Sequence, residues 1–103
     1  MATFQKVAEV GEVAPGTGKA VEAGGQQIAL FNISGTFYAI GDACTHRGGS
    51  LSEGELDGTT VTCPLHAARF DVTTGRNLGP PAPLGVPSYK VRVEGNEVQV
   101  EIP

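Results

Sequence analysis

The stretch YKVRVEGNEVQVEI, from Tyr89 to Ile102, alternates apolar and polar side chains on both sides of a short polar turn. A period of two places every second side chain on the same face of a strand, where it can be buried against a core. The tripeptide Glu94-Gly95-Asn96 between the two halves is typical of a tight turn. The sequence therefore predicts an antiparallel hairpin with these core-facing side chains: Tyr89, Val91, Val93, Val98, Val100 and Ile102.

Two earlier runs, Gln27 to Ile33 and Thr36 to Ile40, also have the composition of strands, and Gly24-Gly25 and Ser34-Gly35 mark turns beside them. No window of the chain shows a period near 3.6, and the spacing of Gly and Pro would interrupt a long helix. The glycine-rich segment from Gly11 to Lys19 lacks the Gly-Lys-Ser/Thr ending of a phosphate loop and is predicted to be a turn. The predicted fold class is all-β, a small antiparallel sandwich or partly open barrel.

The composition bounds the size, partners and location of the protein. With 103 residues, 40% of them hydrophobic and 17% charged, the chain has the size and composition of one globular domain, and its 15 glycines indicate many turns. A net charge of −4 argues against a polyanionic partner such as nucleic acid. The first ten residues lack the pattern of a secretory signal and no run is long enough to cross a bilayer, so we expect a cytoplasmic protein.

The two cysteines and two histidines of the chain all fall in two short clusters, Cys44-Thr45-His46 and Cys63-Pro64-Leu65-His66. Each cluster pairs one thiolate with one imidazole inside a segment bounded by turn-forming glycine or proline. Thiolate and imidazole are both good ligands for zinc and iron. The pattern therefore indicates a metal centre to which both segments contribute.

Several other uses of these four residues are open at this point. A buried cysteine or a core histidine explains any one of them, but not four together. A disulfide is unusual in a reducing compartment. A Cys₂His₂ zinc site is the main rival, although zinc fingers usually pair Cys with Cys and His with His. Catalytic Cys-His chemistry would not need two such pairs.

The two motifs closely resemble those of the Rieske family, which has C-x-H, a gap of about sixteen residues, and then C-x-x-H. Here sixteen residues, Arg47 to Thr62, separate the motifs, and Arg69-Phe70-Asp71 and Thr74-Gly75 extend the likeness downstream. Ala67 stands where the family usually has glycine. The resemblance implies a Rieske-type sandwich or barrel, a single domain over residues 1–103, with cluster-binding loops at about 42–50 and 62–69.

By this resemblance Cys44 and Cys63 bind one iron of a [2Fe–2S] cluster, and His46 and His66 bind the other through Nδ1. A proline-rich loop at about 79–87 would cover this cluster, of which each chain would hold one. The prolines of this loop are Pro80, Pro81, Pro83 and Pro87.

The resemblance also bears on the reduction potential. Two neutral imidazoles leave the oxidised centre uncharged, which raises its potential above that of an all-cysteine cluster. High-potential relatives have hydroxyl donors where this chain has Ala68 and Phe70, and a loop-to-loop disulfide where it has Gly49 and Leu65. We therefore expect a low potential, near the bottom of the roughly −150 to +300 mV Rieske range.

A one-electron carrier is the function that the resemblance implies. Both histidines are assigned to the cluster, which leaves none for the mononuclear iron site of an oxygenase. The chain looks like the ferredoxin of ring-hydroxylating dioxygenase systems of aromatic hydrocarbon catabolism, a monomer that takes electrons from an NAD(P)H-dependent flavin reductase and passes them to a terminal Rieske oxygenase. A small Rieske subunit of assimilatory nitrite reductase is the alternative role, and a zinc-stabilised structural module is the alternative class.

Overall fold

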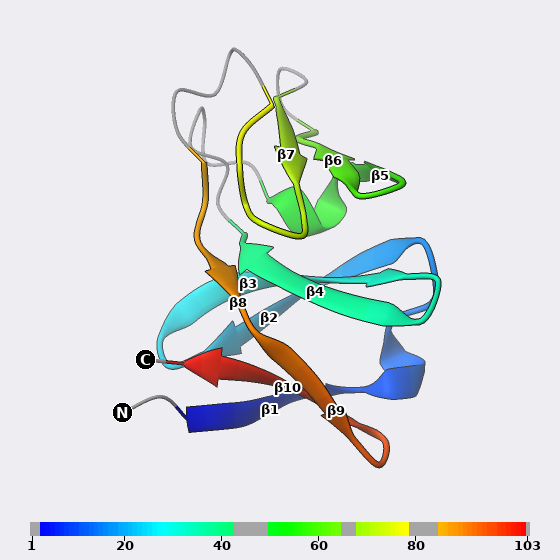
Figure 1. Cartoon of the computed structure of the whole chain (residues 1–103), viewed down its shortest axis with the longest axis vertical. Helices are drawn as coiled ribbons and strands as arrows, with labels where there is room; N and C mark the ends of the chain where they lie inside the picture. The colour runs from blue at the N-terminus through cyan, green and yellow to red at the C-terminus, as the bar shows by residue number, and fades with distance from the viewer. Residues whose placement is uncertain (1–2, 43–49, 65–67, 79–84, 103) are drawn as a thin grey trace.

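The computed structural model describes residues 3–42, 50–64, 68–78 and 85–102, which form three antiparallel sheets stacked in layers (Figure 1). The first sheet has the order β1 (Thr3–Glu9), β10 (Glu97–Ile102), β9 (Val91–Glu94). The second has the order β2 (Thr17–Ala23), β3 (Gln26–Ile33), β4 (Thr36–Gly41), β8 (Ser88–Tyr89). The third has the order β5 (Glu55–Asp57), β6 (Thr60–Thr62), β7 (Arg69–Asp71). This confirms the all-β prediction.

Strand β3 is buried on both faces and separates two hydrophobic cores. Its alternate residues Ile28 and Leu30 face one core, and Ala29 and Phe31 face the other, as the period of two requires. The base core, between the first and second sheets, consists of Ala8, Val13, Val21, Ala23, Ile28, Leu30, Phe37, Ala39, Val98 and Val100. The loop-side core, between the second and third sheets, consists of Ala29, Phe31, Ile40, Leu51, Val61, Cys63, Ala68, Phe70, Val72 and Val86.

The predicted C-terminal hairpin is present, with one correction to its buried face. Val98 and Val100 are fully buried as expected, but Val93 is 47% exposed. The reason is that β9 is the edge strand of its sheet and its turn extends beyond the neighbouring layer (Figure 1). Tyr89 lies in β8 instead, paired with Ala39 of the second sheet, so the chain changes sheets between β8 and β9.

The turn predictions are partly confirmed. Ser34 and Gly35 both have positive φ angles, 52° and 93°, which suits the tight turn between β3 and β4. The prediction of a turn from Gly11 to Lys19 is wrong for its last three residues, because β2 begins at Thr17. Gly18 has no side chain to reveal the strand, and the ring of Phe31 occupies the space where one would lie.

The helical content of the described residues is two 3-10 turns, η1 (Val10–Glu12) and η2 (Leu51–Glu53). Within residues 3–42, 50–64, 68–78 and 85–102, no helix is long and apolar enough to cross a membrane. The turn η2 packs on β2 and β3, and thereby brings the chain that follows residues 43–49 back to the second sheet.

Candidate metal centre

Of the four predicted ligands, Cys63 lies within the described part of the chain, and Cys44, His46 and His66 lie outside it. The prolines of the predicted covering loop also lie outside the described residues, except for Pro87. The described part of the site consists of the residues that flank three segments, 43–49, 65–67 and 79–84. We call these flanking residues the stems of the segments.

The stem of the second motif is the β6–β7 hairpin. Thr60, Val61 and Thr62 pair with Asp71, Phe70 and Arg69, and one further hydrogen bond joins Cys63 N to Ala68 O at 2.6 Å. Cys63 is two residues after buried Val61, so its side chain lies on the same face, in the loop-side core, and is 2% exposed. The hairpin thus holds Cys63 in place at the mouth of its loop.

The stem of the first motif is closed by Asp42, which follows β4. Its carbonyl oxygen accepts a hydrogen bond from Leu51 N at 2.7 Å, and its carboxylate Oδ1 accepts one from Ser52 N at 2.8 Å. The Asp42 amide donates to Gln27 O at 3.1 Å, and the residue is 6% exposed. Sequence reasoning missed Asp42 as part of the site; its signal is a single acidic residue just before the first motif.

The two ends of the proline-rich stretch are attached to the other two stems. At one end, Leu78 N donates to Arg69 O at 2.9 Å, beside the second motif. At the other end, Val86 N donates to Gly75 O at 2.8 Å, and Pro87 O accepts from Gly41 N at 2.8 Å, beside the first motif. Three segments far apart in sequence therefore begin and end on one network of backbone hydrogen bonds.

The donor set and its setting fit an iron–sulfur cluster. Two thiolates and two imidazoles are the ligands of a Rieske centre, and the described thiol is buried among apolar side chains. Flanking residues Ala68 and Phe70 are fully buried and carry no side-chain hydrogen-bond donor. No group of three or more Cys, His, Asp and Glu side chains gathers within the described residues, which include one predicted ligand.

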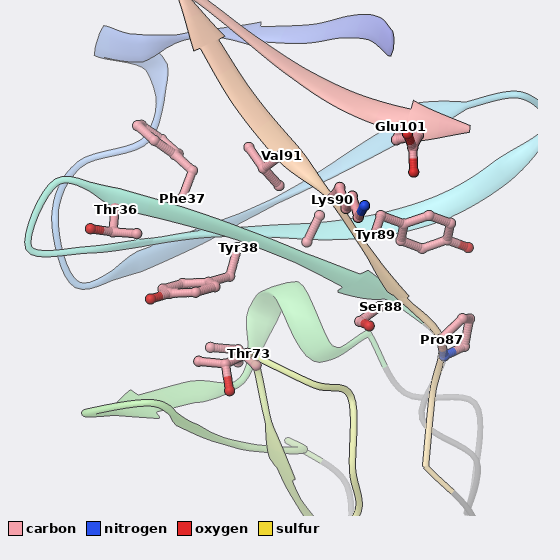
Figure 2. A pocket seen from close by; sticks show the side chains of 12 residues that line it. Thr36, Phe37, Tyr38, Thr73, Pro87, Ser88, Tyr89, Lys90, Val91 and Glu101 are labelled. Carbon is pink, nitrogen blue, oxygen red and sulfur yellow. The ribbon is translucent and has the colours of Figure 1, made fainter. Parts of the chain in front are cut away.

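A separate open groove of about 840 Å³ lies along β4, where β8 leaves it after two paired residues (Figure 2). Tyr38 and Thr73 line one part of it, and Tyr89, Lys90 and Glu101 line another. Among the described residues that line the groove there is no cysteine or histidine.

Comparison with known proteins gives consistent matches over almost the whole chain. Residues 3–90 match the family described as "Rieske [2Fe-2S] domain". The biphenyl dioxygenase ferredoxin subunit of Pseudomonas sp. (strain KKS102) is 44% identical over 100 residues, which are 96% of this chain and 92% of that protein.

Two solved structures have the same fold. The ferredoxin of carbazole 1,9a-dioxygenase from Nocardioides aromaticivorans IC177 is similar with a TM-score of 0.90 and 33% identity, over 95% of this chain and 96% of that one. A chain from a complex of reduced oxygenase and oxidised ferredoxin in carbazole 1,9a-dioxygenase is similar with a TM-score of 0.86 and 37% identity, over 94% and 91% of the two chains.

Proposed function

This chain belongs to the Rieske [2Fe–2S] domain family, and on that premise we propose that it is the electron carrier of a ring-hydroxylating oxygenase system. The observation that carries the proposal is the near full-length likeness to a dioxygenase ferredoxin subunit, 44% identity over 96% of the chain. The relative is a ferredoxin and not the oxygenase that it serves, so the proposed role is to move electrons without acting on a substrate.

The proposed ligands are Cys44 and Cys63 on one iron, and His46 and His66 on the other. When bound, the [2Fe–2S] cluster takes up and releases one electron at a time. The contribution of the chain is to hold the ligands and to limit access of water. The burial of Cys63 in the loop-side core supports both roles.

A low potential follows from the apolar residues beside the second motif. Phe70 is fully buried in the loop-side core, and its ring cannot donate a hydrogen bond to the cluster sulfurs. We expect Phe70→Tyr to raise the potential, and Phe37→Tyr in the base core to leave it unchanged. A redox titration of both variants measures the difference, and equal potentials would contradict the role given to residue 70.

The proposed donor is a flavin reductase that uses NAD(P)H, and the proposed acceptor is a terminal Rieske oxygenase. A ferredoxin–oxygenase complex among the structural relatives supports the acceptor. Such redox contacts are generally small and short-lived, which suits a monomeric carrier. Supply of electrons from NAD(P)H supports the cytoplasm as the place of action.

Low-temperature EPR of the dithionite-reduced protein, followed by stopped-flow mixing with a terminal oxygenase, tests the proposal. We expect a rhombic [2Fe–2S] signal, a low potential and rapid reoxidation by the oxygenase. Protein assembled anaerobically with iron and sulfide that contains zinc but no acid-labile sulfide would identify the structural module instead. Reoxidation by a sirohaem nitrite reductase but not by an oxygenase would identify the alternative role.

A further inference from the structure

We propose that a closed ring of backbone contacts fixes the two cluster loops relative to each other, and that Gly54 and Gly75 are positioning residues within it. The inference rests on the proposed ligand set, because the ring acts through the loops that carry those ligands. The members of this stem ring are Gly41, Asp42, Leu51, Gly54, Thr62, Asp71, Gly75, Val86 and Pro87.

One side of the stem ring runs from the second loop to the first. Asp71, at the end of β7, accepts a hydrogen bond from Gly75 N at 2.7 Å. Gly75 O then accepts from Val86 N, and Pro87 O accepts from Gly41 N, both at 2.8 Å. The hairpin that bears Cys63 is thereby linked to the end of β4, from which the first loop begins.

The other side of the stem ring returns from the first loop to the second. Asp42 O accepts from Leu51 N, and Gly54 N donates to Leu51 O at 2.9 Å. Gly54 lies directly against the carbonyl oxygen of Thr62, and the next residue, Glu55, pairs with Thr62. Because β6 pairs with β7, these contacts close the ring.

Two points of the stem ring accept only glycine. A Cβ on Gly54 would overlap the Thr62 carbonyl and would lie 2.9 Å from Val61 Cγ2. A Cβ on Gly75 would overlap the Val86 carbonyl, and Gly75 also has a positive φ of 79°. In both cases a main-chain atom blocks the space, so a side chain must push the two segments apart.

A ring of this kind matters because no covalent link can take its place. The chain has two cysteines, and the proposed cluster uses both, so none is left to join the loops by a disulfide. A cluster with ligands from both loops requires the loops to keep one separation. We therefore expect a widened ring to alter ligand geometry, and with it the EPR g values and the potential.

The test compares Gly54→Ala and Gly75→Ala with two controls in open space. Gly11→Ala has no atom within 4 Å of the new Cβ and matches Gly54, and Gly16→Ala has the same open space with a φ of 82°, which matches the strain at Gly75. We expect both ring variants to bind iron on the order of 10–100-fold more weakly than wild type, which is the usual cost of changing a residue that supports metal ligands, and to lose it faster to a chelator. Their EPR g values and potentials should also shift, and those of the controls should not.

If Gly75→Ala does not fold, Gly85→Ala takes its place in the test. A Cβ on residue 85 would lie 2.6 Å from Gly75 O, and Gly85 does not have a positive φ. The inference is overturned if the ring variants lose only thermal stability and keep wild-type g values, potential and rate of iron loss. That result leaves the proposed function intact. A wild-type protein that assembles no cluster would instead overturn the proposed function, before any variant is compared.

Discussion

The two faces of β3 carry cores of different construction. The base core is enclosed by long strands, β2 with 7 residues, β3 with 8 and β10 with 6, and apolar side chains at every second position fill it. The loop-side core is covered by β5, β6 and β7, which have 3 residues each, and by the stem ring. The pattern of apolar side chains is therefore sufficient to form the base core. The loop-side core depends in addition on backbone contacts and on the bound cluster.

Removal of a proposed ligand should have the largest effect, and it should change the loop side of the molecule but not the base. Cys63→Ser should abolish cluster assembly, because serine does not replace a thiolate as an iron ligand in this setting. Iron and acid-labile sulfide should fall to background. Amide exchange should rise in β6 and β7, and the amides of β1 and β10 should stay protected, since metal binding is coupled to folding only on the loop side. Iron content equal to wild type would contradict the ligand assignment.

A second prediction uses two neighbours on β3 that face opposite cores. Leu30 and Phe31 are both fully buried, in the base core and the loop-side core respectively. Leu30→Ala should lower the free energy of unfolding by about 2–5 kcal/mol and Phe31→Ala by about 3–5 kcal/mol, because each leaves a cavity. Denaturant unfolding measures both losses.

The potential distinguishes the two variants. Phe31→Ala should shift the potential of the folded protein because its cavity opens in the core that holds Cys63, and Leu30→Ala should not. Equal potentials would mean that the two cores are not separated in the way that the alternation of β3 indicates.

A third, smaller effect concerns docking. Among the described residues the exposed large hydrophobic side chains are Leu78, 39% exposed beside the cluster loops, and Val93, 47% exposed at the far hairpin. Leu78→Asp should slow electron transfer to the oxygenase roughly tenfold, about 1.4 kcal/mol, if the partner binds over the loops. Val93→Asp is the matched control and should leave the rate unchanged. Stopped-flow rates decide between them, and equal slowing by both variants would place the contact elsewhere.

The same comparison explains how far the sequence predicted the structure. Regular alternation indicated the C-terminal hairpin, because half-buried strands leave a periodic trace. Composition and the flanking turns indicated the strand from Gln27 to Ile33, which is buried on both faces. Strands β5, β6 and β7 left none, since three residues are too few to display a period. Val93 was wrongly predicted as buried, because alternation does not show where the covering sheet ends.

The sequence likewise predicted one part of the candidate site and not the other. The ligand set was predicted from residue type and spacing and stays a prediction. Of its four residues, Cys63 lies in the described part of the chain, buried at the mouth of a hairpin loop. The contacts that join the stems could not be predicted. Gly54 and Gly75 are two glycines among 15, and only the folded chain shows which of them touch a carbonyl oxygen.

The smallest expected effect lies on the base side, at an exposed carboxylate. Glu12 Oε2 accepts a hydrogen bond from Lys19 Nζ at 2.6 Å, and Glu12 Oε1 accepts one from Glu9 N at 2.7 Å. The hydrogen bond from Lys19, then that from the Glu9 amide, lower the pKa of Glu12 below its ordinary value of 4.5. A depressed pKa means that this contribution to stability is present above the unfolded pKa and is lost as the pH falls through the folded pKa.

Glu12→Gln should therefore lower the unfolding midpoint slightly at pH 7, and the difference from wild type should shrink below about pH 4.5, the ordinary pKa of the group. Added salt should reduce the difference at pH 7, because the pair is exposed and screened. Glu55→Gln is the control, since Glu55 has no ion pair among the described residues. The cluster potential should not change in Glu12→Gln, because Glu12 lies on the base side, away from the stem ring; a shifted potential in this variant would show that the base and the loop side are coupled.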